Sequence, residues 1–187
     1  MYGKVEYIID SGSVEVGLES TVLDITSDIP VILRPGKITR EQLEAVLGKV
    51  DIDPSLVSKD TAVLKPRAPG MKYRHYAPKA KVIVVEGDTA SIAEYINRAS
   101  EEQRENGVLT GVMATDETVG LYKTGKIISL GSRKHPTDIA ARLFDALREF
   151  DTTDIQLIYA EAVEKKGIGA AIMNRLNKAA GNNKVSV

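Results

Sequence analysis

The sequence predicts an α/β protein organised in three parts, and three observations support this prediction. Residues 79–187 alternate short apolar runs of the β type with amphipathic segments of the α type. Residues 1–48 contain several short apolar runs but only one helical pattern, and residues 49–78 have no periodicity and several prolines. We therefore expect an incomplete first domain, a proline-rich linker, and a small open, mostly parallel sheet with helices on both faces.

The first part reads as strands and turns followed by one helix. We expect strands in the apolar runs at residues 5–9, 21–25 and 31–33, which glycine, serine, aspartate and proline residues separate. Thr39 is a suitable N-cap and Gly48 a suitable stop for the helix. So few elements provide a poor independent core. We expect this part to be disordered, to pair with another copy, or to dock on the third part.

The second part, residues 49–78, reads as an ordered or semi-stiff loop. Proline removes a backbone donor and restricts the residue before it, and four prolines lie here, namely Pro54, Pro66, Pro69 and Pro78. The stretch PRAPGMKYRHYAP at residues 66–78 also contains basic residues, two tyrosines and His75. His75 and Tyr76 either pack two domains together or contact a ligand, and residue types alone favour packing.

The pattern of residues 79–187, the third part, predicts a parallel sheet. Strand patterns lie at residues 82–85, 108–114, 126–130 and 155–160. Three helical patterns begin at Asp88 or Thr89, at Thr137 and near Ile168, and they end at Gly107, Phe150 and about Ala180. Strands that alternate with helices of this length require crossover connections, so we expect parallel pairing with helices on the faces of the sheet.

The composition excludes several classes of function. The net charge is −1 and the pI is near 6.2, so no overall basic field would draw the chain to nucleic acid. The absence of cysteine excludes disulfides, thiolate metal sites and a cysteine nucleophile. His75 and His135 are not spaced as a metal site, and His135 reads as a loop residue. No apolar run of about 18 residues occurs. We expect a cytoplasmic protein with no membrane partner and no strong direct binding to nucleic acid.

Two hydroxyls and an arginine form the first candidate site. Ser20 and Thr21 open one predicted strand, and Arg34 follows the next one. Hydroxyls suit the polar head of an amino acid, and a guanidinium fork suits phosphate. Alternatively, the hydroxyls cap a strand and Arg34 pairs with Glu19 or Asp24. Residue chemistry alone leaves both interpretations open.

The second candidate is an anion site at the head of the last helix. Gly167 and Gly169 lie there, with Lys165 and Lys166 beside them. A lone Gly-x-Gly is weak evidence because such turns are common at βα junctions, and the full dinucleotide fingerprint and the phosphate loop are absent from the sequence. A nucleotide site here is the less favoured interpretation. Loss of nucleotide binding in a folded Gly169→Asp variant would support it.

Four stretches together resemble successive motifs of one family. They are GLESTVLD at residues 17–24, ILRPGKIT at 32–39, PGMKYRHYAP at 69–78 and GIGAAIMNRLNKAA at 167–180. On these motifs the chain is identified as a member of the two-domain L-threonylcarbamoyladenylate synthases. In that family a YrdC-type catalytic domain is joined by a linker to a Rossmann-like C-terminal domain. The resemblance implies the end of a YrdC-type domain at residues 1–48, the linker, and a Rossmann-like domain at residues 79–187.

The resemblance also implies an activity and its site. The family condenses L-threonine, bicarbonate or CO2, and ATP into threonylcarbamoyl-AMP and pyrophosphate. Threonylcarbamoyl-AMP then supplies the threonylcarbamoyl group that a tRNA threonylcarbamoyltransferase machinery places on adenosine 37 of tRNA. Carried over by motif, Ser20 contacts L-threonine, Arg34 contacts the nucleotide, and His75 and Tyr76 belong to a nucleotide-contacting segment that closes over the site. Mg²⁺ is expected with ATP, and the motifs assign neither a metal ligand nor a catalytic residue.

One departure from the family limits the resemblance. The Lys-x-Arg and Ser-x-Asn motifs of the catalytic domain do not precede Tyr2. We therefore expect an incomplete and inactive catalytic domain. A rival interpretation is a non-catalytic regulatory or partner-binding α/β module of the tRNA-modification machinery. A third is a stand-alone nucleotide-binding protein, which rests on Gly167 and Gly169 alone.

Overall fold

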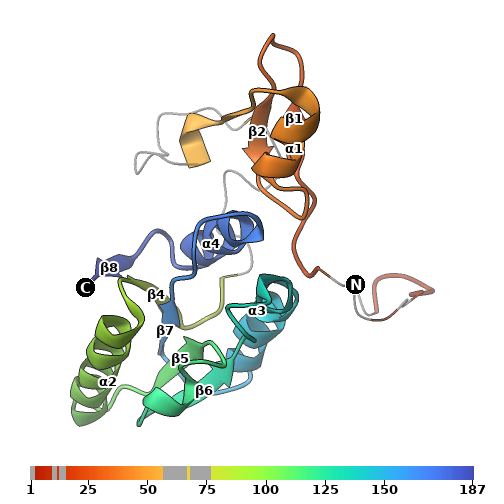
Figure 1. Cartoon of the computed structure of the whole chain (residues 1–187). Coiled ribbons are helices and arrows are strands. Elements are labelled where there is room, and N and C mark those ends of the chain that lie inside the picture. Colours follow the sequence, from red (N-terminus) through yellow and green to blue (C-terminus); the bar gives the residue numbers. More distant parts are fainter. Residues whose placement is uncertain (1–2, 10–11, 13–15, 57–66, 68–76) are drawn as a thin grey trace.

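The computed structural model describes residues 3–9, 12, 16–56, 67 and 77–187, and this part of the chain contains two sheets (Figure 1). The first sheet comes from the N-terminal part of the chain, drawn in orange. The second comes from the C-terminal part, drawn from yellow-green to blue, and α4 is the helix of this part that lies nearest to the first sheet in the view.

The N-terminal sheet has the strand order β1-β2-β3 within the described residues. β1 (Val22–Asp24) pairs antiparallel with β2 (Val31–Arg34), and β2 pairs parallel with β3 (Asp51–Ile52). α1 (Arg40–Leu47) connects β2 to β3, and the short 3-10 helix η1 (Pro54–Leu56) follows. A parallel pair needs a crossover connection, which α1 provides.

α1 begins and ends where the sequence predicts. The N–H of Gln42 donates to Oγ1 of Thr39 at 3.4 Å, and the N–H of Thr39 donates to Oε1 of Gln42 at 2.9 Å. This reciprocal pair is a capping box. Gly48 follows the helix with φ of +76°, a conformation that glycine adopts without steric cost, and its N–H donates to the carbonyl of Glu44.

The C-terminal sheet is parallel at every pairing of the described strands, as predicted. Its strands are β4 (Lys81–Glu86), β5 (Thr110–Ala114), β6 (Lys126–Ser129), β7 (Leu157–Glu161) and β8 (Lys184–Ser186). Their order is β6-β5-β7-β4-β8. From β5 the chain continues to β6 at one edge of the sheet, and from β7 it continues to β8 at the other edge. The connections that follow these two neighbouring strands therefore run in opposite directions, and a topological switch point lies between β5 and β7.

Helices cover both faces of the C-terminal sheet. α2 (Thr89–Glu105) packs on one face through a buried cluster that includes Ile96. α3 (Pro136–Phe150) and α4 (Ile168–Ala179) pack on the other face through a cluster that includes Leu143. The predicted fold class is confirmed, and the three helices lie where their patterns indicated. None of the helices in the described ranges is long and apolar enough to cross a membrane.

The structure differs from the sequence prediction at three strands. Residues 5–9 form no strand, and Tyr7 and Ile9 are exposed there. An apolar run becomes a strand only when a neighbouring strand pairs with its backbone groups. The prediction also missed β3 and β8, which have two and three residues. Such short strands carry no readable periodicity.

The N-terminal sheet docks on the C-terminal domain, which is the third of the expected arrangements. Val16 and Leu18 pack against the core cluster that contains α3 and α4. Gly17 lies so close to α3 that a Cβ at this position would be 2.6 Å from the carbonyl oxygen of Ala141. The chain is therefore fixed on the C-terminal helices just before it enters the candidate site.

Candidate functional site

Ser20 and Arg34 lie side by side at one end of the N-terminal sheet. Ser20 is exposed and stands two residues before β1, and Arg34 is the last residue of β2. Because the two strands are antiparallel, the start of one meets the end of the other. Nε of Arg34 donates a hydrogen bond to the carbonyl oxygen of Ser20 at 2.9 Å. The structure thus brings together the two residues that the motifs assigned to L-threonine and to the nucleotide.

Gly36 lets the two halves of this site approach closely. We call residues 19–21 and 34–36 the site segments. A Cβ at Gly36 would lie 2.4 Å from the backbone nitrogen of Thr21, closer than any real contact. The hydroxyl of Thr21 also donates to the carbonyl oxygen of Ile38 at 2.7 Å. A larger residue at position 36 would push the site segments apart.

The two carboxylates that the sequence suggested as partners of Arg34 form ion pairs with other arginines. Oε2 of Glu19 accepts from Nε of Arg175 at 2.5 Å, and the carboxylate of Asp24 pairs with Arg67. Partial burial by itself raises the pKa of Glu19, but the charge of Arg175, hydrogen bonds and the charge of Arg34 together outweigh it. The pKa of Glu19 therefore lies below its usual range, and the carboxylate stays ionised.

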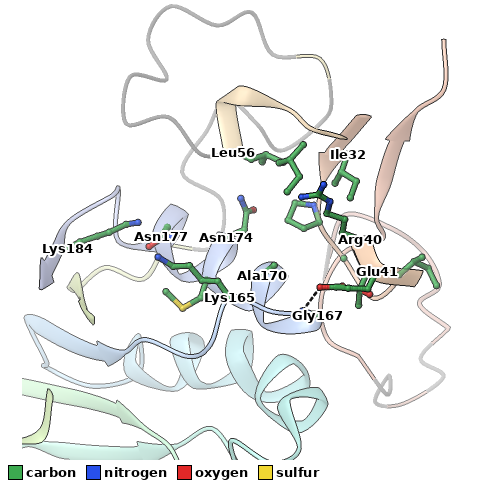
Figure 2. Close-up of a pocket in the computed structure, with 16 residues that line it drawn as sticks. Ile32, Arg40, Glu41, Leu56, Lys165, Gly167, Ala170, Asn174, Asn177 and Lys184 are labelled. Carbon is green, nitrogen blue, oxygen red and sulfur yellow. Dashed lines mark hydrogen bonds between the residues drawn. The ribbon is translucent and has the colours of Figure 1, made fainter. Parts of the chain in front are cut away.

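A pocket of about 390 Å³ lies between the N-terminal sheet and α4 (Figure 2). Its apolar wall comes from Ile32, Ile52 and Leu56 of the N-terminal part. Gly167 and Asn174 belong to the opposite wall, which α4 and the loop before it provide. The pocket therefore marks the junction between the two parts of the chain.

Three cationic side chains also line this pocket, and each has a carboxylate partner. Nε of Arg40 lies 2.8 Å from Oε1 of Glu44. The Nζ atoms of Lys165 and Lys184 lie 3.0 and 3.7 Å from Oε1 of Glu86. The close ion pair with Lys165, aided by the charge of Lys184 and opposed by partial burial, keeps the pKa of Glu86 below its usual range. The pocket thus presents cations that are already paired.

The Gly-x-Gly turn at the head of α4 has a structural explanation. A Cβ at Gly169 would lie 1.9 Å from the carbonyl oxygen of Glu164, so only glycine fits the turn. The N–H of Gly167 donates to Oε1 of Glu41 at 3.4 Å, shown as a dashed line in Figure 2. A carboxylate of α1 therefore lies at the position where the sequence suggested an anion. These contacts favour the interpretation of the motif as a turn.

A polar cluster that the sequence analysis missed lies at the switch point between β5 and β7. Glu161, at the end of β7, is 2% exposed. Its Oε2 accepts from Nη2 of Arg133 at 2.6 Å and from the hydroxyl of Thr115 at 3.2 Å, and its Oε1 accepts from the hydroxyl of Tyr122. Burial, together with this carboxylate, raises the pKa of Tyr122. The only sequence signal was a carboxylate at the end of an apolar strand.

Three further residues that the sequence singled out are His75, Tyr76 and His135. His75 and Tyr76 fall outside the described residues. His135 is the N-cap residue of α3 and makes no side-chain capping bond, as expected of a loop residue. In the ranges that the structure describes, no group of three or more His, Cys, Asp or Glu side chains could hold a metal ion.

These features define a Rossmann-like α/β domain on which a serine and an arginine lie together at one end of a second sheet. Residues 38–181, well over half of the chain, match the family model described as the C-terminal domain of threonylcarbamoyl-AMP synthase. The chain is also similar to named threonylcarbamoyl-AMP synthases over 96% of its length. The identities are 45% for Pyrococcus abyssi, 44% for Bacillus subtilis and 35% for Schizosaccharomyces pombe.

Two solved structures have the same fold. The crystal structure of P. abyssi Sua5 complexed with L-threonine covers all of this chain at 44% identity with a TM-score of 0.90. A double variant of that protein, with a histidine and the next tyrosine both changed to alanine, also has a TM-score of 0.90, at 42% identity and with full coverage of this chain. The chain covers 52% of each solved chain and spans about half the length of the curated relatives it matches.

The chain belongs to the threonylcarbamoyl-AMP synthase family, an enzyme family, and contains its C-terminal domain. The resemblance inferred from the motifs is confirmed.

Proposed function

We propose that this chain forms part of an enzyme that joins L-threonine, bicarbonate or CO2, and ATP into threonylcarbamoyl-AMP with release of pyrophosphate. The observation that carries the proposal is the contact between Ser20 and Arg34 in a chain of this family. The P. abyssi structure solved with L-threonine supports the amino-acid substrate. The product would serve modification of adenosine 37 of tRNA in the cytoplasm, through the downstream threonylcarbamoyltransferase machinery.

Ser20 and Arg34 have side chains suited to the two substrates. A serine hydroxyl offers one donor and two acceptor positions, which fit the polar head of L-threonine. The N–H groups of the Arg34 guanidinium suit the α-phosphate of ATP, where charge develops as pyrophosphate leaves. Mg²⁺ would accompany ATP, bound chiefly through phosphate oxygens.

His75 and Tyr76 complete the proposal as part of a closing segment. In the division of the chain that we propose, both residues belong to the linker at residues 49–78. This linker joins the end of the catalytic domain, at residues 1–48, to the C-terminal domain, at residues 79–187. His75-Tyr76 is the only His-Tyr pair in the sequence, and a His-Tyr pair is the one replaced in the solved P. abyssi variant. Closure would protect the mixed anhydride from water, and the prolines would reduce the entropy lost in closing.

A chimeric enzyme tests this function. This chain is joined behind the half of the P. abyssi synthase that it does not match, and pyrophosphate release from ATP is followed together with mass spectrometry of the product. We expect release that needs both L-threonine and bicarbonate and that yields threonylcarbamoyl-AMP. Arg148→Met, at an exposed position of α3, is the matched control and should leave activity unchanged. A folded chimera that forms no threonylcarbamoyl-AMP would refute the proposal.

Calorimetric titration of the 187-residue chain with ATP, with and without L-threonine, separates this function from an independent nucleotide site. If the chain binds ATP and Arg34→Met weakens that binding, the result supports a nucleotide contact at the site segments. Binding of ATP that is equal in the unaltered and Arg34→Met chains would show that the nucleotide binds elsewhere. It would remove Arg34 from the proposed site.

A further inference from the structure

Arg175 of α4 reaches from the C-terminal domain to both site segments. Its side chain is only 4% exposed. Its Nε donates to Oε2 of Glu19 at 2.5 Å, and its Nη2 donates to the carbonyl oxygen of Pro35 at 3.2 Å. Glu19 directly precedes Ser20, and Pro35 directly follows Arg34. A single guanidinium therefore binds the chain neighbours of both residues proposed to contact substrate.

The contacts of Arg175 use the shape of its guanidinium. Its third nitrogen, Nη1, donates to Oδ1 of Asn174 at 2.6 Å, so all three nitrogens have partners. The planar fork holds these N–H groups at fixed angles, whereas a lysine would offer one nitrogen on a flexible chain. A lysine at position 175 could satisfy one site segment but not hold both at a fixed spacing.

α4 is a firm support for this side chain. Ile172 and Leu176, on either side of Arg175 in the sequence, are fully buried in the core of the C-terminal domain. The hydrogen bond between Gly167 and Glu41 ties the start of the same helix to α1. The position of the guanidinium is thus set by a packed helix rather than by a surface loop.

The charges around Glu19 strengthen this link. Burial and then the charge of Arg175 lower the pKa of Lys178, Arg34 lowers it further, and Glu19 raises it. One carboxylate therefore faces Arg175, Arg34 and Lys178 together. Loss of Arg175 would leave the Glu19 carboxylate without its main partner, and loss of Glu19 would leave the three cations to repel one another.

We propose that Arg175 is a positioning residue that fixes the spacing of the two site segments, and with it the placement of Ser20 and Arg34 for L-threonine and ATP. This inference rests on the function proposed above for those two residues. It gives the C-terminal domain a part in catalysis without any contact to substrate. It also gives a role to the fourth motif, GIGAAIMNRLNKAA, which contains this arginine.

Hydrogen exchange of the 187-residue chain tests the positioning directly. Arg175→Met should speed exchange about tenfold in residues 19–24 and 31–36, with no change in β4, β5 and β7, because only the local constraint is lost. Arg175→Lys should give an intermediate effect, and Arg148→Met should give none. Unchanged exchange in the two segments of a folded Arg175→Met chain would overturn the inference. Should that variant not fold, Glu19→Gln removes the same ion pair and is interpreted in the same way.

Kinetics of the chimera supply the functional readout. Arg175→Met should raise KM for L-threonine about tenfold, and Arg175→Lys should partly restore it. A purely structural role would lower the amount of folded enzyme and leave KM unchanged, which would count against positioning. An inactive unaltered chimera would refute the proposed function instead, and the exchange rates of the 187-residue chain would still decide whether Arg175 holds the two segments.

Discussion

Nη2 of Arg133 lies 2.6 Å from Oε2 of Glu161, and this ion pair occupies the switch point between β5 and β7. Open α/β sheets commonly bind ligands at such a point. Here the switch point carries a carboxylate whose side chain is 1% exposed, together with the hydroxyls of Tyr122 and Thr115 that donate to it. The carboxylate at this point is therefore paired with side chains of the domain itself, and we predict that the pair contributes to stability.

Arg133→Met should lower the free energy of unfolding by about 3 kcal/mol, because removing one partner leaves the buried Glu161 carboxylate without its counter-ion. Urea denaturation of the unaltered chain and of the Arg133→Met chain measures the difference in their free energies of unfolding. Arg148→Met is the control, since Arg148 pairs with Asp145 at the surface and should contribute less than about 1 kcal/mol. Equal losses in the two variants would contradict a special role of the buried pair.

Glu117 should make the loop before α3 sensitive to acid. Its carboxylate accepts from the hydroxyl of Ser132 at 2.6 Å and from the N–H of Arg133 at 3.0 Å. The Ser132 hydrogen bond foremost, and that of Arg133, lower the pKa of Glu117 from 4.5 to about 2, although desolvation opposes them. A pKa that is lower in the folded state gives stability that is present above about pH 4.5 and lost as the pH falls toward 2.

Glu117→Gln should therefore destabilise the protein at neutral pH, and the difference from the unaltered chain should vanish near pH 2. Chemical denaturation at several pH values between 2 and 7 measures this difference. Glu105→Gln, at the exposed end of α2, is the control and should change stability little at any pH. A difference for Glu117→Gln that is the same at all pH values would show that its charge does not anchor the loop.

Gly169 should tolerate no side chain. Gly169→Ala places a Cβ about where the carbonyl oxygen of Glu164 lies, so we expect a loss of roughly 1–3 kcal/mol as the turn before α4 shifts. Gly120→Ala is the control, because a Cβ there meets nothing within 4 Å. Thermal unfolding compares the two, and a Gly169→Ala chain as stable as Gly120→Ala would contradict the close contact. Gly169→Asp would likewise disturb the turn, so it cannot separate loss of a ligand from local unfolding.

Local patterns predicted the elements that carry their own signals, and they missed what depends on distant residues. Thr39 and Gly48 define α1 through bonds within one turn, so their sequence is sufficient. The motifs named Ser20 and Arg34, and antiparallel pairing explains why they meet. By contrast, Arg175 is 156 positions from Glu19, and no periodicity links two residues so far apart. The docking of the two parts, which depends on such contacts, becomes visible only in three dimensions.

Ser20 and Arg34 should affect different kinetic constants of the chimera. Ser20→Ala removes a hydrogen-bonding group proposed for L-threonine, so KM for L-threonine should rise while KM for ATP stays unchanged. Arg34→Met removes a cation proposed to stabilise charge as pyrophosphate leaves, so kcat should fall by roughly 10²-fold. Initial rates measured with each substrate varied in turn separate these effects.

Arg34→Lys is the informative companion to this pair of variants. It keeps the charge but lacks the fork that also binds the Ser20 carbonyl, so kcat should recover only in part. Full recovery with lysine would mean that charge alone suffices and that the contact between Arg34 and Ser20 is incidental. A rise in KM for ATP upon Ser20→Ala, with no change for L-threonine, would reverse the assignment of the two residues to their substrates.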